Sequence, residues 1–281
     1  MIIENVDWQL TSVCNRNCKY CFGPSHIKSL TKDEIFRIID CLSSNGVNQL
    51  GITGGEPLLH PDIEEIINYA VNIGLSIYLS TNCDYYFKYA KLIKEKVSII
   101  GIPIDGSNEE THDYLRGHGS FENIKSVLND ISNSNSKIKI KFGTVITNCN
   151  QNDLIAIEKF ISEYSSKIIF WKLYEMITYE RNINGTKELC CNDETEKNNL
   201  GHFLDKQIII DDTKSKRNKS YFFLKPNGDV FVPELTQYIS NEHIIGNLLV
   251  DDFKKIANRF QTIVNSIGYY SNYRYMKNEK E

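Results

Sequence analysis

Short apolar segments rich in β-branched residues alternate along the chain with segments of helical periodicity. Six of these apolar segments begin near Val6, Asn48, Leu75, Val97, Lys137 and Lys167. Alternating strand and helix patterns are typical of a parallel sheet. Six strand–helix units are fewer than the eight of a closed barrel, so the pattern predicts an α/β fold with an open, partial (β/α)6 barrel. Ligands of such folds bind at the carboxyl ends of the strands.

The alternation stops near Met176, where a polar stretch begins. Further along, Tyr221–Lys225 and Asp229–Val232 flank a Pro-Asn-Gly turn at 226–228, a pattern that predicts a β-hairpin. A short helix is expected around Phe253. We therefore expect a core barrel at residues 1–176 and a C-terminal extension at 177–281, with a hairpin lid, a helix and a tail.

Composition and charge exclude several classes of protein. The chain of 281 residues is 41% hydrophobic and 24% charged, which is ordinary for a globular protein, and its net charge of -4 argues against a nucleic-acid binder. The apolar stretch Val97–Ile104 is far shorter than the roughly 20 residues of a membrane-spanning helix. Residues 1–7 show no secretory signal pattern, so we expect a cytoplasmic protein whose eight cysteines are ligands, catalytic groups or buried side chains.

Three cysteines follow the first predicted strand within one compact loop. Cys14, Cys18 and Cys21 form the sequence CNRNCKYC. Thiolates at this density favour an iron–sulfur cluster or zinc. No second cysteine pair lies nearby, so three thiolates would leave one iron of a [4Fe-4S] cluster open to a ligand that is not protein. The alternative is a structural zinc site with His26 or Cys41 as its fourth ligand.

This CxxxCxxC motif, with Tyr20 before its last cysteine, is followed after the second predicted strand by Gly54-Gly55-Glu56-Pro57. Together the two motifs resemble the radical S-adenosylmethionine (SAM) superfamily over about residues 7–176. The resemblance implies a [4Fe-4S] cluster whose open iron is chelated by SAM. It further implies reductive cleavage of SAM to a 5'-deoxyadenosyl radical that abstracts hydrogen from a substrate C–H bond. A flavodoxin or ferredoxin is implied as the one-electron donor.

The resemblance also implies roles for individual residues. Glu56 and the paired glycines are expected near the amino group of SAM, because glycines permit a close backbone approach and a carboxylate attracts an ammonium group. Tyr20 and Phe22 are expected against the adenine. The cluster ligands would be Cys14, Cys18 and Cys21, and the SAM contacts would be Tyr20, Phe22, Gly54, Gly55, Glu56, Pro57, Ser80, Asn82 and Asp105.

The expected substrate side is basic. Residues 137–144 alternate lysines with apolar residues, which predicts that Lys139 and Lys141 share the face of the strand away from the helices. Lys172 interrupts an apolar strand, and Arg116 follows the fourth strand. We expect Arg116, Lys141, Lys172 and Glu175 at the substrate mouth, where cations would hold a small anionic molecule such as a nucleotide. The alternative is that the lysines line a solvated lower edge of the barrel.

Resemblances to two subfamilies suggest two different substrates. Lys141, Trp171 and Lys172 resemble the corresponding positions of viperin-like nucleotide dehydratases, although Gly143 stands where those proteins have asparagine. Residues 224–230 and 245–248 instead resemble the end of peptide-modifying radical SAM enzymes. Pro233 and Glu234 occupy the region where those enzymes carry cysteines, so an auxiliary cluster is not expected. A peptide-modifying enzyme and a zinc-stabilised binding protein thus remain as alternatives.

Four further residues have less specific interpretations. Cys83 and Cys149 follow strand ends, where a thiol can give a hydrogen atom to a product radical, but burial as a small hydrophobic side chain is the favoured reading. His60 and His112 lie in loops, where a surface or capping role is expected.

Overall fold

The computed structural model describes residues 3–23, 26–178, 186–191, 196–235 and 240–264. These residues fall into two compact units. The first unit comprises the described parts of Met1–Cys14, Gly23–Ser80 and Ser215–Glu281, and the second comprises those of Asn15–Phe22 and Thr81–Lys214. The division between a core barrel and a C-terminal extension, expected at residue 176, stays a prediction.

The first unit contains a sheet with the strand order β10-β9-β8-β1-β2-β3. Strands β8, β1, β2 and β3 are parallel, whereas β8, β9 and β10 are joined antiparallel. The expected hairpin is thereby confirmed, and β10 is a strand that the sequence did not predict. The strands are β1 Asn5–Thr11, β2 Gln49–Gly54, β3 Ser76–Ser80, β8 Phe223–Leu224, β9 Asp229–Leu235 and β10 Ser240–Asn247.

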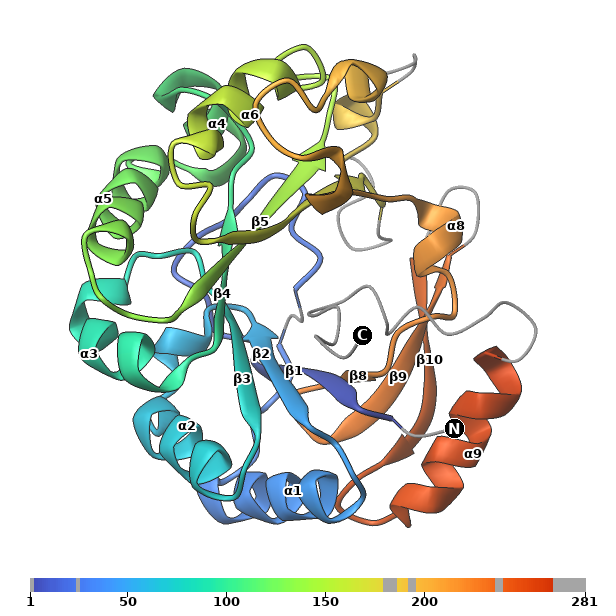
Figure 1. Ribbon diagram of the computed structural model, residues 1–281. Helices are drawn as coiled ribbons and strands as arrows, with labels where there is room; N and C mark the ends of the chain where they lie inside the picture. The colour runs from blue at the N-terminus through green and yellow to red at the C-terminus, as the bar shows by residue number, and fades with distance from the viewer. Residues whose placement is uncertain (1–2, 24–25, 179–185, 192–195, 236–239, 265–281) are drawn as a thin grey trace. The chain divides into compact units, whose positions relative to one another are not determined.

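Helices lie along one face of this sheet (Figure 1). The first helix begins as expected from its capping box, in which the Thr31 hydroxyl accepts the Glu34 amide while the Glu34 carboxylate accepts the Thr31 amide. Its buried side chains recur at helical spacing, so it presents one apolar face. The helical elements are α1 Lys32–Ser44, η1 Pro57–Leu59, α2 Ile63–Asn72 and α9 Phe253–Val264.

The second unit contains the parallel sheet β4-β5-β6-β7. Strand β7, which pairs with β6, was not predicted from the sequence. The strands are β4 Ile99–Pro103, β5 Lys139–Ile146, β6 Ile168–Glu175 and β7 Ile209–Asp212. The helical elements are α3 Tyr86–Lys96, α4 Glu109–Arg116, α5 Ser120–Ser132, α6 Leu154–Ser162, η3 Lys187–Leu189, η4 Glu196–Asn199 and η5 Lys206–Ile208, and α8 Lys214–Arg217 spans the boundary between the units.

The six predicted strands are present as β1–β6, so the expected α/β class with parallel strands is confirmed. The two faces of these strands differ in polarity. In β1, Val6, Trp8 and Leu10 are fully buried apolar residues, and they alternate with the buried polar residues Asp7, Gln9 and Thr11. No helix among the described residues has both the length and the apolar character needed to cross a bilayer.

Candidate functional site

The cysteine loop supplies three thiols within eight residues of chain. Cys14 is exposed at the end of a segment of the first unit, whereas Cys18 is half-buried and Cys21 is exposed in the second unit. None of the three forms a disulfide. Burial raises the pKa of the Cys18 thiol, an effect that the nearby Arg116 opposes. Soft sulfur donors in this number and spacing fit an iron–sulfur cluster with one open iron.

An ion pair that the sequence analysis did not anticipate holds this loop within the second unit. Arg16 donates through Nε and Nη2 to the two carboxylate oxygens of Asp84, at 2.6 and 2.5 Å. Asn15 and Asn123 donate to the same carboxylate at 2.5 and 2.7 Å. Although burial alone would raise it, these hydrogen bonds hold the pKa of Asp84 below its ordinary value. Asp84 therefore connects the residues between Cys14 and Cys18 to the segment that follows Asn82.

The expected SAM contact Asp105 lies fully buried after β4 and binds two other expected site residues. One of its oxygens accepts hydrogen bonds from the Tyr20 hydroxyl and from Nε of Arg116. The other accepts the Val145 amide at 2.8 Å. Although burial alone would lower it, the Asp105 carboxylate raises the pKa of Arg116, so the guanidinium stays charged. The structure thus joins Tyr20, Asp105 and Arg116 in one buried network.

The surroundings of Arg116 explain why the chain has a histidine at position 112 and a glycine at position 106. His112 accepts the Asp105 amide on Nδ1 at 3.1 Å, so Nε2 carries the proton and faces the Ser120 hydroxyl at 3.1 Å. A Cβ atom on Gly106 would lie 2.5 Å from the His112 amide nitrogen, so only glycine fits. The expectation of a surface or capping role in a loop is wrong for His112, because it lies within α4 and its fully buried side chain binds the Asp105 amide.

The Gly-Gly-Glu-Pro turn lies in the first unit and is bound to the end of β1. The Gly55 amide donates to the Thr11 carbonyl at 2.7 Å, and the Glu56 amide donates to the Val13 carbonyl at 2.8 Å. A Cβ atom on Gly55 would fall 2.2 Å from the Val13 oxygen. The glycines are thus required for the approach of the chain to itself. Glu56 is fully buried, and its carboxylate accepts the Leu58 amide at 3.0 Å.

The other expected SAM contacts have different surroundings. Ser80 is half-buried at the end of β3, Pro57 is buried at the start of η1, and Phe22 is 43% exposed. The Asn82 carboxamide donates to Asn15 Oδ1 at 2.9 Å and accepts the Asp84 amide at 3.0 Å. Asn82 therefore supports the cysteine loop, and its contact with SAM stays a prediction.

Two of the expected substrate residues are buried lysines on neighbouring strands of the second unit. Lys141 is 5% exposed and Lys172 is 1% exposed. Lys172 lies opposite Gly143, two residues after Lys141, so the two lysines share one face of the sheet. By contrast Lys139 is exposed and donates to the Ser166 carbonyl at 3.4 Å, as expected for a solvated edge. Strand alternation puts Glu175 on the face opposite to Lys172.

Gly143 marks a departure from the viperin-like pattern with a visible structural reason. A Cβ atom at this position would lie 3.0 Å from Cε2 of Tyr174. The Tyr174 ring therefore occupies the space that an asparagine side chain would need, and its centroid lies 6.0 Å from Nζ of Lys141.

The two isolated cysteines differ from each other. Cys83 is buried, as expected for a small apolar residue, and adopts a positive φ of 74°. Cys149 is exposed, so the prediction that it is buried as a small hydrophobic side chain is wrong. The cause is its position in the turn after β5, where its thiol contacts the Asn148 side chain at 3.2 Å.

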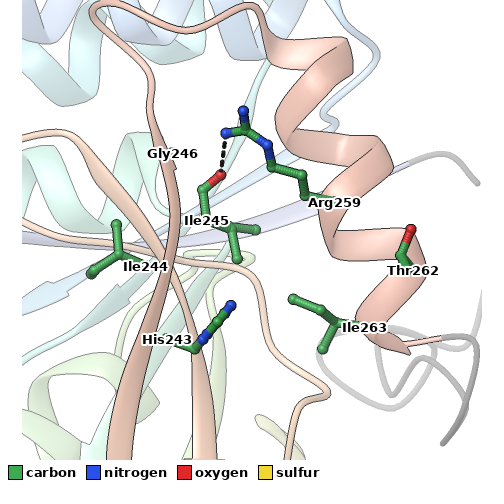
Figure 2. A pocket seen from close by; sticks show the side chains of 7 residues that line it. All are labelled: His243, Ile244, Ile245, Gly246, Arg259, Thr262 and Ile263. Atoms are coloured by element: carbon green, nitrogen blue, oxygen red, sulfur yellow. Dashed lines mark hydrogen bonds between the residues drawn. The ribbon is translucent and has the colours of Figure 1, made fainter.

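A separate open pocket of about 460 Å³ lies between β10 and α9 in the first unit (Figure 2). His243, Ile245 and Ile263 line it, and Arg259 donates to the Ile245 carbonyl at 2.8 Å. None of the residues implicated by the two motifs lines this pocket. We therefore place the candidate chemistry elsewhere.

Comparison with known proteins identifies relatives over most of the chain. Residues 8–161 match the radical SAM superfamily. An S-adenosylmethionine-dependent nucleotide dehydratase of Selenomonas ruminantium is 28% identical over 271 residues, which cover 91% of this chain and 94% of the relative. A protein of the same name from Flammeovirga pacifica is 23% identical and covers 96% of both chains.

Among solved structures, Streptococcus suis SuiB bound to S-adenosylmethionine has a similar fold, with a TM-score of 0.66 and 15% identity. The match covers 81% of this chain but only 59% of SuiB, which has also been solved with its precursor peptide SuiA. The similarity confirms the expected partial barrel of radical SAM type. The cofactors of this chain are accordingly a [4Fe-4S] cluster and SAM, and the thiol set described above fits the cluster. The chain belongs to the radical SAM superfamily of enzymes.

Proposed function

We propose that this enzyme uses its radical chemistry on a nucleotide and catalyses the loss of water from it. The observation that carries the proposal is the extent of similarity to the two nucleotide dehydratases, which spans at least 91% of this chain and 94% of each relative. A relative that shares only the barrel would leave the C-terminal third of this chain unmatched. Similarity beyond the barrel favours a shared substrate class.

Cys14, Cys18 and Cys21 would hold the cluster, and the Gly54–Pro57 turn would hold SAM together with Ser80, Asn82 and Asp105. When bound, the two cofactors supply a 5'-deoxyadenosyl radical that removes hydrogen from carbon. The chain's own part is to keep the thiols and the turn in place. Two backbone hydrogen bonds fix the turn to the end of β1, and Asp84 fixes residues 15 and 16 of the loop. An external flavodoxin or ferredoxin would supply the electron.

The substrate side depends on charge in the second unit. Asp105 and Arg116 form an ion pair, and Lys141 and Lys172 place two further basic side chains on one face of the sheet. Lysine ammonium groups bind phosphate oxygens as point charges. The phosphates of a nucleotide suit these two lysines, and Arg116 would add a directed contact beside them. Glu175 is the last residue of β6 and lies on the face opposite to Lys172, so it is proposed for the rim of the mouth at the end of the strand and not beside the lysines.

The test is a substrate screen with anaerobically reconstituted, chemically reduced enzyme. Nucleoside mono-, di- and triphosphates are compared with candidate peptides, and each reaction is assayed for 5'-deoxyadenosine and for a product lighter by one water. A nucleotide that increases 5'-deoxyadenosine formation and loses water is the expected result. A peptide that increases 5'-deoxyadenosine formation instead would favour the peptide-modifying alternative. SuiB, whose fold is similar to that of this chain, has been solved with a precursor peptide. Zinc without iron and sulfide in the reconstituted protein would favour the non-enzymatic alternative.

A further inference from the structure

A buried carboxamide in the first unit has no hydrogen-bond partner. The side chain of Gln9 in β1 is 1% exposed. Among the residues that the structure describes, neither its Oε1 nor its Nε2 meets a partner. Burying an amide without hydrogen bonds is unfavourable, and native structures contain few such groups. A side chain kept in this state needs a reason outside the folded chain itself.

The position of Gln9 suggests that reason. Gln9 lies on the polar face of β1, opposite Thr53 of β2. Thr53 directly precedes Gly54 and Gly55, so the carboxamide is next to the turn assigned to SAM and near the carboxyl ends of parallel strands, where ligands of such folds bind. On the adjacent strand, Gly51 and Thr53 are both small, so neither covers the carboxamide with a bulky side chain.

An aromatic surface lies on the same face of the sheet. Phe223 of β8 pairs with Asp7, two residues before Gln9. Its ring stacks on Tyr221 with centroids 5.3 Å apart and on Phe231 of β9 with centroids 5.2 Å apart. Aromatic rings favour contact with other planar groups. The face thus combines a donor and acceptor pair with a wall that suits a flat ligand.

We propose that Gln9 recognises the base of the nucleotide substrate, an assignment that rests on the proposed function. A carboxamide offers one acceptor and two donors in a plane, and it can pair with a base edge that offers the complementary donor and acceptor. The unpaired amide becomes satisfied only when the substrate is bound.

The test measures stability and binding in the same variant. Gln9→Leu replaces an unpartnered polar side chain with an apolar one of similar size, so the thermal midpoint of the apoprotein should be unchanged or higher. The dissociation constant of the nucleotide found in the screen should rise about tenfold or more. Inorganic triphosphate, which has no base, should bind the variant as it binds the wild type. Gln9→Glu accepts but does not donate in its charged form, so it should favour bases with an exocyclic amino group.

Gln49→Leu is the matched control. Gln49 is buried on β2 opposite Asn5, at the other end of the strand from Thr53, and its Oε1 also lacks a partner. This substitution should leave nucleotide affinity unchanged.

Several results would overturn the assignment. Nucleotide affinity that is unchanged in both Gln9 variants would refute it and leave the proposed function standing. A loss of SAM affinity alone would also refute it, because Gln9 would then bind the cofactor. A Gln9→Leu protein that is destabilised or does not fold would refute it by showing that Gln9 has a structural role. Failure of the wild type to bind any nucleotide would refute the proposed function and this assignment together.

Discussion

Arg16 and Asp84 form a two-point ion pair across 68 residues of sequence, with Nε–Oδ2 and Nη2–Oδ1 distances of 2.6 and 2.5 Å. Both side chains are largely buried, at 10% and 14% exposure. Arg16 also donates through Nη1 to the Gly117 carbonyl at 3.0 Å. The residue between two cluster cysteines is therefore held from two sides before any metal binds.

Removing the carboxylate should loosen the cysteine loop. We expect Asp84→Ala to lower the free energy of unfolding of the apoprotein by about 2 kcal/mol or more, because Arg16 would keep its charge in a largely buried place without a carboxylate to balance it. Iron incorporation on reconstitution should fall as well. Chemical denaturation and iron and sulfide analysis would measure the two effects.

The control for this prediction is Glu122→Gln, which removes an exposed ion pair with Lys125 in the same unit. Exposed pairs contribute little, so its unfolding free energy should change by less than about 1 kcal/mol. If Asp84→Ala unfolds and incorporates iron like this control, the loop is ordered by something other than the Arg16–Asp84 pair.

The buried His112 predicts a pH dependence of stability. Burial lowers the pKa of His112 from 6.5 to about 4, while Asp105 and Asp113 oppose and Arg116 reinforces this change. Between these two values the unfolded chain binds a proton that the folded chain does not. Stability contributed by His112 should therefore be complete above about pH 6.5 and fall as the pH is lowered to about 4, by roughly 3 kcal/mol at most.

Urea unfolding of the apoprotein across this pH range would measure the effect. His112→Gln keeps an acceptor for the Asp105 amide but does not titrate, so its stability should depend less on pH. His118→Gln is the control, since it removes a histidine whose side chain is 96% exposed. Identical pH profiles for wild type and His112→Gln would contradict the assignment.

The close approach at Gly55 predicts a steric effect. Gly55→Ala would put a methyl group 2.2 Å from the Val13 oxygen, so the turn or the start of the cysteine loop must move. We expect a loss of about 2 kcal/mol or more in unfolding free energy and weaker SAM binding. Gly74→Ala is the control, because nothing lies within 4 Å of its added Cβ and only its φ of 96° is unfavourable. Because Gly55 does not have a positive φ, a loss in Gly55→Ala no larger than that in Gly74→Ala would show that the chain relieves the contact with Val13 at little cost.

The sequence predicted those features whose causes are local. The Thr31–Glu34 capping box, the six strands and the hairpin turn at Gly228 each follow from residues a few positions apart. The Arg16–Asp84 pair depends on which loops the fold brings together, and no periodicity records that. Strand β10 was missed because its sequence mixes Glu242 and His243 with apolar residues. Gly54 and Gly55 are required where the turn approaches Thr11 and Val13, and their contact with SAM stays a prediction.

The buried lysines yield the sharpest prediction for the substrate side. Lys172→Met removes the ammonium group and nearly keeps the volume, and its unfolding free energy is measured beside that of the wild type so that a loss of binding is not confused with a loss of folding. Nucleotide affinity should fall about tenfold or more, because a phosphate contact with a buried cation is lost. Lys139→Met is the control on the same face of the sheet, where the side chain is exposed. Isothermal titration of both variants and of wild type would decide the matter. Equal affinity in Lys172→Met and Lys139→Met would show that the nucleotide's charge is held elsewhere.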